Sequence, residues 1–407
     1  MTASSSPAPS SPAPSASHSV WRLTLVLGAL SAFTPLSVDM YLPSLPTLEQ
    51  VFDTDTGRVQ MTLSVFFIGL ALGQLLLGPV SDRYGRRRPL LAGNLLFILA
   101  SAACALSTTV DHLIFWRFFQ AGGSCAGMVI GRAMVRDLFE PRDMAKVFSM
   151  LMLVMGVAPI LAPLLGGYVL VWFDWHAIFW IEVVFGMLVM VAALRLLPET
   201  HDHAAAQPLH LGRILRSYGS LLATARFMGY SLASSLGLAG MFAYVASAPF
   251  VFINLFHVPA DSFGWIFGSN AVGFIGMAQV NRLLLRRFTL DEVLIGGLSL
   301  ASVAGLVLVL MAATGFGGMI GVWLPLFVYI ASMGVVLPNA GANAMAGESR
   351  RAGMAAALMG TLQFTAGAAS SGLLSLLSTG SALPMAGGVA LCGLCALGAR
   401  LVLVRPS

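Results

Sequence analysis

The sequence predicts an all-α membrane protein with twelve transmembrane helices, and three observations lead to this fold class. The 407 residues are 57% hydrophobic and only 10% charged, whereas a water-soluble protein carries about 25% charged residues. Apolar runs of about 20 residues, the length that a helix needs to cross a bilayer, recur along the chain. The runs are continuous, and they lack the alternation of apolar and polar residues that marks the strands of a membrane barrel.

The apolar runs form two sets of six, separated by a longer polar link. The first set lies near 22–43, 59–80, 88–107, 112–132, 146–171 and 175–197, and the second near 226–252, 262–281, 292–312, 318–346, 352–377 and 381–403. Equal halves joined in this way are typical of transporters built from repeats. We therefore expect two six-helix bundles, 21–197 and 226–407, a linker at 198–225, and a disordered Ser/Pro/Ala-rich tail at 1–20.

Positive charge predicts the orientation of the helices in the membrane. Links that alternate along the chain hold almost all Lys and Arg residues, and the other links hold only Arg58. By the positive-inside rule, both termini and the linker are expected to be cytoplasmic. The alternation persists across all twelve runs, which supports their number, and it accounts for the net charge of +5 without nucleic-acid binding.

No cofactor or metal is expected. Cys104 and Cys125 lie in apolar spans, and so do Cys392 and Cys395, whose CxxC has no second ligand pair; we interpret all four as packing residues. A scattered histidine tract in the linker leaves metal binding open there as an alternative, at His201, His203 and His210. The sequence contains no GxxxxGK[ST], HExxH or GxSxG pattern, so neither an ATP site nor an enzyme is expected. The expected energy source is the proton gradient.

The link after the second run holds the stretch GPVSDRYGRRR, from Gly78 to Arg88. Gly78 would let a neighbouring helix approach closely, and Gly85 would supply the positive φ of a tight turn. Asp82 at the membrane edge can pair with an arginine or face a helix N-terminus, while the arginines hold the link in the cytosol. An anchor that only fixes topology would need the arginines but not Asp82 or the two glycines.

An arginine, Arg117, lies inside the fourth run, in the stretch RFFQAGG that also contains Gln120. Placing an arginine in a bilayer costs about 2.5–3.5 kcal/mol, so its side chain normally faces a cavity or a partner. Arg117 lies only six residues after Asp111, about 9 Å along a helix axis. A side chain that snorkels outward is therefore the alternative.

The fifth run contains the stretch GVAPILAPLLGG, from Gly156 to Gly167, with Pro159, Pro163 and Gly166 between its ends. Glycine and proline weaken local helical hydrogen bonding and permit close packing, so this helix can bend where the two halves meet. Ordinary tolerance of Gly and Pro in membrane helices is the alternative.

These motifs resemble those of the major facilitator superfamily, whose signature loop between spans two and three matches the stretch after the second run. DMYLP at Asp39, RAMVRD ending at Arg136 and Asp137, and PET at Pro198 further resemble drug:proton antiporters of the Bcr/CflA type. Ala162 departs from the pattern, since glycine usually precedes that proline. The resemblance covers almost the whole chain after residue 20. It implies a major facilitator fold, with two six-helix bundles around a central cavity, in the bacterial inner membrane. We expect the chain to be a monomer.

The resemblance also implies proton-coupled efflux of small drug-like molecules by alternating access. In the family, the loop after span two latches the halves on the cytoplasmic side, which implies a gate here at Gly78, Asp82, Arg83, Gly85, Arg86, Arg136 and Asp137. The stretch in the fifth run resembles the antiporter signature of exporters. The alternative is a proton-coupled importer of a small metabolite with the same fold, because the direction of transport is inferred mainly from that stretch.

Three charged residues within the apolar runs are candidates for proton coupling: Asp39, Arg117 and Glu182. A carboxylate in apolar surroundings holds a proton more readily, and an approaching cation opposes this, so Asp39 can exchange a proton when Arg117 or a cationic drug comes near. Asp39 lies 17 residues after Arg22, about 25 Å along a helix and nearer the outer face than the midplane. Capping at the outer interface is thus the alternative for Asp39, and an interfacial position is the alternative for Glu182. A bent, longer first helix is predicted by Pro35, Pro43 and Pro46.

Spans seven to twelve have no acidic or basic side chain in their interiors, so coupling is expected in the N-terminal half. The C-terminal half would contribute apolar and weakly polar surface to the substrate cavity. The candidate cavity residues are Tyr41, Gln120, Tyr244, Asn270 and Gln363. Simple helix packing is the alternative role for these residues.

Overall fold

The structure is a computed structural model that describes residues 16–200, 211–348, 351–377 and 380–404, and these residues contain helices and no β-strand. The first half comprises α1 (Ala16–Pro35), η1 (Leu36–Met40), η2 (Leu42–Ser44), α2 (Leu45–Val51), α3 (Thr56–Tyr84), α4 (Arg87–Ala105), α5 (Val110–Leu138), α6 (Pro141–Trp172) and α7 (Trp175–Leu196). The second half comprises α9 (Ala225–Pro249), η4 (Phe250–Leu255), α10 (Ala260–Leu284), α11 (Leu290–Thr314), α12 (Gly318–Met345), α13 (Ala352–Leu376) and α14 (Leu383–Leu403).

The link between the halves contains α8 (Leu211–Leu222), a helix that was not predicted. At the other boundary, α1 begins at Ala16, inside the expected disordered tail. The rest of that tail lies outside the described residues, as does the histidine tract His201, His203 and His210.

Ten helical segments in the described residues are long and apolar enough to cross a membrane, and they coincide with ten of the twelve predicted runs. The other two runs, 262–281 and 352–377, coincide with α10 and α13, which have 25 residues each. Both helices are long enough to span a bilayer, but neither contains an 18-residue window as hydropathic as those of the other ten. They also make the most extensive contacts between the halves, where α10 packs against α6 and α13 packs against α3.

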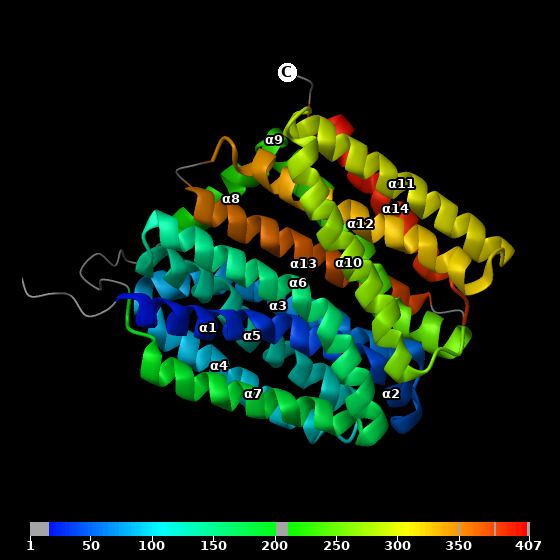
Figure 1. Cartoon of the computed structure of the whole chain (residues 1–407), viewed down its shortest axis with the longest axis horizontal. Helices are drawn as coiled ribbons and strands as arrows, with labels where there is room; N and C mark the ends of the chain where they lie inside the picture. The colour runs from blue at the N-terminus through cyan, green and yellow to red at the C-terminus, as the bar shows by residue number, and fades with distance from the viewer. Residues whose placement is uncertain (1–15, 201–210, 349–350, 378–379, 405–407) are drawn as a thin grey trace, which may run out of the picture.

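The two halves form two adjoining groups of helices. Figure 1 shows α1 to α7 below and α9 to α14 above, with α6 and α13 along the border between them and α10 running across the upper group to that border. Within the first group α5 packs against α3 and α4, and within the second α9 packs against α13 and α14.

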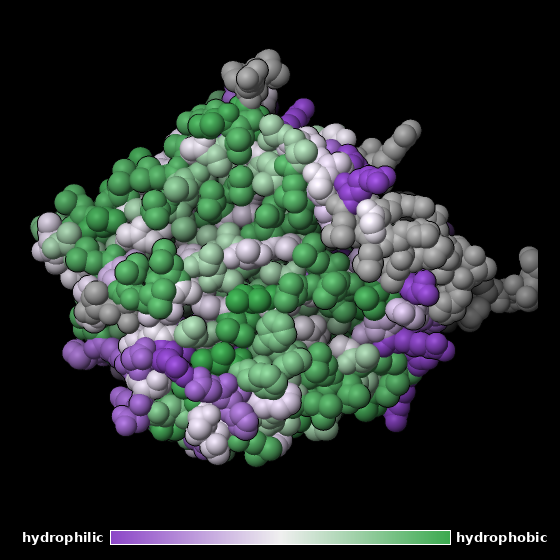
Figure 2. Space-filling model, turned by 180° about the vertical axis from the view of Figure 1, so that it is seen from behind, coloured by the Kyte–Doolittle hydropathy of each residue, from purple (hydrophilic) through white to green (hydrophobic). Residues whose placement is uncertain are grey.

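Large apolar side chains cover the outside of the molecule. Leu188 is 66% exposed, Leu310 56% and Leu161 51%. On the face drawn in Figure 2 the surface is mainly hydrophobic, and hydrophilic residues gather at its right and lower left edges. An apolar surface of this extent is unfavourable in water, and it suits a bundle surrounded by lipid chains.

The first helix continues past its predicted end at residue 43. After α1 ends at Pro35, the chain forms the π-helical turn η1 and the short 3₁₀ turn η2, and α2 then carries the helical segment to Val51. The prolines explain this irregular stretch, because each lacks the N–H that an α-helix would use. Asp39 is therefore about 18 Å from the end of the segment by helical rise. It is deeper than an end at residue 43 implies, but it still lies on the predicted side of the middle of Trp21–Val51.

The two ends of the bundle differ in charge and in contact. We call the end that carries Arg83, Arg86 and Arg136 the basic end, and the end that carries Arg58 and Asp111 the opposite end; they lie at the left and right of Figure 1. Near the opposite end the halves touch closely. The Ser64 and Ser371 hydroxyls are 2.8 Å apart across the border between α3 and α13.

Glycines at the opposite end let the backbones of the two halves come into direct contact. A Cβ placed on Gly57 of α3 would lie 2.1 Å from the Ser375 carbonyl oxygen of α13, and one on Gly167 of α6 would lie 2.4 Å from the carbonyl oxygen of Ala260 in α10. Only glycine fits at such positions. The structure therefore describes a state whose halves are in contact at the opposite end.

Candidate functional site

A buried polar cluster in the first half joins α4, α5 and α7. Gln120 lies between two charged residues: its Oε1 accepts a 2.6 Å hydrogen bond from Arg117 Nη1, and its Nε2 donates a 2.6 Å hydrogen bond to Glu182 Oε2. The same nitrogen lies 2.7 Å from the hydroxyl oxygen of Ser101, which accepts from it. Arg117 and Gln120 are fully buried, and Glu182 is 1% exposed. Ser101 was not predicted as a site residue, because a lone serine in an apolar run carries no signal of its own.

Aromatic rings surround the Arg117 guanidinium. Its carbon lies 4.5 Å from the ring centre of Tyr41 and 4.3 Å from that of Phe66, so both rings can stabilise the cation through their π faces. The Tyr41 hydroxyl is 3.0 Å from that of Thr62. Arg117 Nε and Nη2 have no hydrogen-bond partner among the described residues. The side chain is thus an enclosed cation, and the alternative of outward snorkelling is wrong.

Asp39 lies apart from this cluster, in the π-helical turn η1, and is 7% exposed. No described Lys, Arg or His lies within ion-pair distance of its carboxylate. A π-helical turn in a helix often marks a functional position. Burial excludes the alternative in which Asp39 caps the first span at an exposed interface, and the expected approach of Arg117 to Asp39 is absent from this state.

Asp39 faces the other half. Its carboxyl group is close enough to the Tyr244 hydroxyl of α9 for the two to interact electrostatically. Tyr244 in turn accepts a 2.8 Å hydrogen bond from Asn270 Nδ2 of α10, and its ring stacks on Phe267. Asn270 Oδ1 is buried without a hydrogen-bond partner among the described residues. Two predicted cavity residues therefore lie together near Asp39.

The remaining predicted cavity residues are separate from this pair. Tyr41 and Gln120 belong to the surroundings of Arg117. Gln363 of α13 is half-buried and donates a 3.2 Å hydrogen bond to the Ser234 hydroxyl of α9.

At the basic end, Arg86 joins two segments that are distant in the sequence. Its Nε donates a 3.0 Å hydrogen bond to Asp137, and its Nη1 contacts Asp82 and the Ser81 hydroxyl. Desolvation opposes the charge on Arg86, but the hydrogen bonds and charges of Asp137 and Asp82 outweigh it and raise the pKa of Arg86. The expected pairing of Asp82 with an arginine is therefore present.

Glu199, from the PET stretch after α7, caps the start of α4. Its two carboxylate oxygens accept from the backbone N–H groups of Arg86 at 2.8 Å and Arg87 at 3.2 Å, where a helix N-terminus favours negative charge. Gly85 has φ +84°, which confirms the expected turn. A Cβ at Gly85 would also lie 2.5 Å from Glu199 Oε2, so a side chain here would displace the end of Glu199 in addition to straining the backbone.

The other three residues of the predicted gate, Gly78, Arg83 and Arg136, lie outside the contacts made by Arg86 and Glu199. A Cβ at Gly78 would meet no atom within 4 Å, so the expected close approach of a neighbouring helix is wrong for this state, in which space remains beside that part of α3. Arg83 lies over the ring of Tyr84, and Arg136 donates to the Arg132 carbonyl.

The stretch in the fifth run lies on α6, which continues through Pro159 and Pro163. A Cβ at Gly166 would lie 2.0 Å from the Met40 carbonyl oxygen. Gly166 thus admits the backbone next to Asp39, while Gly167 admits the start of α10. The close packing expected of this stretch is confirmed at both glycines. Gly156 has only ordinary contact with Ile275.

Comparison with known proteins agrees with this architecture. Residues 27–375 match the family described as Major Facilitator Superfamily. The chain is 37% identical over 369 residues to an uncharacterized MFS-type transporter of Bacillus subtilis, YdgK, covering 89% of this chain and 90% of the relative. It is 33% identical over 371 residues to a bicyclomycin resistance protein homolog of Haemophilus influenzae, covering 90% and 92%. A D-xylose-proton symporter structure superposes with a TM-score of 0.75 at 15% identity, covering 95% and 98%; at that identity the likeness concerns the fold.

Proposed function

The chain belongs to the major facilitator superfamily, and we propose that it exports small drug-like molecules in exchange for protons. Membership makes it a multi-pass membrane transporter of small molecules and not an enzyme. The relative named for bicyclomycin resistance supports export of a drug. Bicyclomycin is accordingly the first substrate to test.

The observation that carries proton coupling is the burial of two acids in the first half without a full set of partners. Asp39 is 7% exposed and Glu182 is 1% exposed, and Glu182 Oε1 has no hydrogen-bond partner among the described residues. A buried charge costs free energy unless it is paired or neutralised by a proton. Acids held in this way change their protonation when the surrounding groups move, which is what coupling requires.

Asp39 is the primary proton carrier in this proposal because it lies at the border between the halves. When the halves separate at the opposite end, Asp39 loses the neighbouring Tyr244 and gains access to water. A proton taken up there is released after the bundle closes again and opens at the basic end. Such a cycle needs different proton and substrate affinities in the two states. Arg117 and Glu182 tune the cavity electrostatically in this scheme.

The cluster at the basic end would act as the gate on that side. Arg86 ties the end of α3 to the end of α5 through Asp82 and Asp137, so these helices move together. By the distribution of Lys and Arg, the basic end and both termini are cytoplasmic. We place the chain in a bacterial inner membrane as a monomer, with residues 21–197 and 226–407 as the two moving bundles and the proton gradient as its energy source.

The test is transport by the purified chain in proteoliposomes with an imposed pH gradient. Asp39→Asn should lower gradient-driven bicyclomycin transport at least tenfold while substrate exchange without a gradient continues. Asp111→Asn is the matched control, because Asp111 is exposed and pairs with Arg58 at the opposite end. Gradient-driven transport that survives Asp39→Asn with its pH dependence unchanged would show that Asp39 is not the carrier.

The second candidate function, proton-coupled import of a small metabolite, predicts the opposite direction of flux. Gly166 and Gly167 favour export because their stretch resembles the exporter signature. In cells overproducing the chain, export should raise resistance to the transported drug, and a protonophore should abolish that resistance. Increased drug sensitivity or uptake would favour the importer instead.

A further inference from the structure

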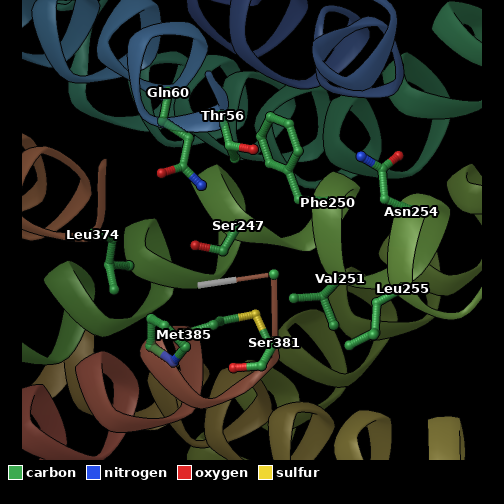
Figure 3. A pocket seen from close by; sticks show the side chains of 12 residues that line it. Thr56, Gln60, Ser247, Phe250, Val251, Asn254, Leu255, Leu374, Ser381 and Met385 are labelled. Atoms are coloured by element: carbon green, nitrogen blue, oxygen red, sulfur yellow. The ribbon is translucent and has the colours of Figure 1, made fainter. Parts of the chain in front are cut away.

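A pocket of about 190 Å³ lies between the halves near the opposite end of the bundle. Thr56 and Gln60 of α3 line it from the first half, and Figure 3 shows them facing residues of α9 and η4 such as Ser247 and Val251 across the space. None of the candidate proton-coupling residues lines it. The pocket is therefore a site separate from those already described.

The pocket has a buried floor and an exposed rim. Gln60, Ser247 and Met385 are buried, whereas Asn254 and Ser381 are exposed. A small molecule can therefore approach from the end of the bundle and place one part of itself out of contact with water.

Gln60 provides an unused hydrogen-bond acceptor in the floor. The side chain is 3% exposed; its Nε2 donates a 3.3 Å hydrogen bond to the Ala246 carbonyl oxygen of α9. Its Oε1 has no hydrogen-bond partner among the described residues. Figure 3 shows the Gln60 and Ser247 side chains pointing into the same space. A buried polar atom without a partner is unfavourable, and a ligand that donates a hydrogen bond to it would remove that cost.

The lining selects for a neutral ligand. It contains no Asp, Glu, Lys, Arg or His, and its apolar part includes Phe250, Val251 and Met385. A charged ligand would lose its hydration without gaining a countercharge. A neutral molecule with an apolar body can instead cover these side chains while its donor reaches Gln60.

We propose that this pocket binds a small neutral molecule that combines an apolar ring with a hydrogen-bond donor such as a primary amide, and that the bound molecule holds the opposite end closed. Thr56 and Gln60 are the two lining residues from the first half, so a ligand loses its hydrogen bond to Gln60 and its contact with Thr56 when the halves separate. It therefore binds the closed state preferentially and shifts the equilibrium toward it. The expectation that the ligand enters this pocket from outside the cell rests on the membrane orientation proposed above. The expectation that the pocket binds the ligand does not depend on that orientation.

Binding is tested on the purified full-length chain in detergent, with benzamide as the probe and ligand-observed NMR as the measurement. We expect a Kd on the order of 1 mM, as for a ligand of this size, and at least tenfold weaker binding of benzoate. Gln60→Leu should weaken benzamide binding at least tenfold. The matched control Gln279→Leu makes the same change at an exposed residue of α10 outside the pocket and should alter the Kd less than twofold.

A second variant distinguishes loss of the pocket from misfolding of the chain. Met385→Trp fills the floor and should abolish benzamide binding in a chain that still elutes as a single species on size exclusion. Equal benzamide binding by wild type and both pocket variants, equal binding of benzoate, or no binding of benzamide at 20 mM each overturns the proposal.

The effect on conformation has its own readout. Spin labels at the exposed positions Thr108 and Thr314, in a chain whose four cysteines are replaced by alanine, report the separation of the halves at the opposite end. Benzamide should increase the population with the short distance in the wild type and not in Gln60→Leu. An unchanged or longer distance distribution in the presence of bound benzamide would overturn the claim that the ligand holds this end closed. Neither experiment requires transport, so each can fail independently of the proposed function.

Discussion

Gln120 donates a 2.6 Å hydrogen bond to Glu182, and this contact ties α5 to α7 inside the first half. Because the other end of the same amide accepts from Arg117, a neutral group lies between a buried cation and a buried acid. An amide does not titrate in the physiological range, so Arg117 and Glu182 act on each other through their charges and not by direct proton transfer. Gln120 also fixes the orientation of both side chains.

Replacing Gln120 by leucine tests this arrangement. Gln120→Leu removes hydrogen bonds to two charged groups, each worth about 1.5–3 kcal/mol, and leaves both groups buried. We expect the apparent Tm of the purified chain to fall by roughly 5 °C or more and gradient-driven transport to fall at least tenfold. Gln74→Leu is a buried control on α3, where the amide has only a 4.0 Å contact with the Met128 sulfur. Equal effects of the two variants would argue against a special role for Gln120.

The turn at Gly85 should tolerate no side chain. Gly85→Ala adds a Cβ at φ +84° and ψ 167°, a conformation used almost only by glycine that costs about 1–3 kcal/mol, and it pushes against Glu199. We expect lower thermal stability and weaker transport. Removing the carboxylate in Gly85→Ala/Glu199→Ala should add less destabilisation than the two single changes together, because the close contact is then absent. The matched control is Gly276→Ala, which meets open space on α10; strict additivity would disprove the predicted contact.

The contact at Gly57 should control the balance between the two states. Gly57→Ala places a Cβ 2.1 Å from the Ser375 carbonyl oxygen of the other half, so it disfavours the closed opposite end more than the open one. We expect the Thr108 to Thr314 spin-label distance to shift toward longer values. Gly296→Ala meets no neighbouring atom within 4 Å and should leave the distribution unchanged. A shift of equal size in both variants would contradict this role of Gly57.

The ion pair between Arg400 and Asp291 should stabilise the second half without taking part in transport chemistry. Arg400 is 5% exposed and contacts Asp291, which also accepts from the Tyr230 hydroxyl at 3.0 Å. Because the Asp291 side chain is 31% exposed, we expect Arg400→Met to cost about 2 kcal/mol, less than for a fully buried pair. The measurement is the apparent Tm, and Asp291→Asn/Arg400→Met should recover part of the loss. A change in the pH dependence of transport by the folded variant would contradict a purely structural role.

Several site residues were identifiable from sequence because their cost is local. An acid or arginine inside an apolar run is unusual whichever side of the helix it lies on. Asp39, Arg117 and Glu182 can therefore be recognised from the sequence without a structure. Their partners do not stand out. Gln120 was predicted only as a cavity residue and Ser101 not at all, and the rotation of α4, α5 and α7 about their axes is what brings both to Glu182.

Local signals did not predict how far the first helical segment extends beyond Asp39. The apolar run weakens near residue 43, but the chain remains helical to Val51 through a π turn and a 3₁₀ turn. Continued burial of this stretch against α6 and the second half, including the Met40 backbone at Gly166, outweighs the helix-breaking effect of its prolines.

The sequence by itself determined the fold class, the number and length of the apolar runs and the expected sidedness, because a bilayer imposes its thickness and its charge asymmetry on each helix separately. Only the tertiary structure decided which polar groups meet: Gln120 with Glu182, Glu199 with the start of α4, and Gln60 with a pocket between the halves. These contacts join residues that are far apart in the chain. They depend on how helices are rotated and packed, and no single segment encodes that.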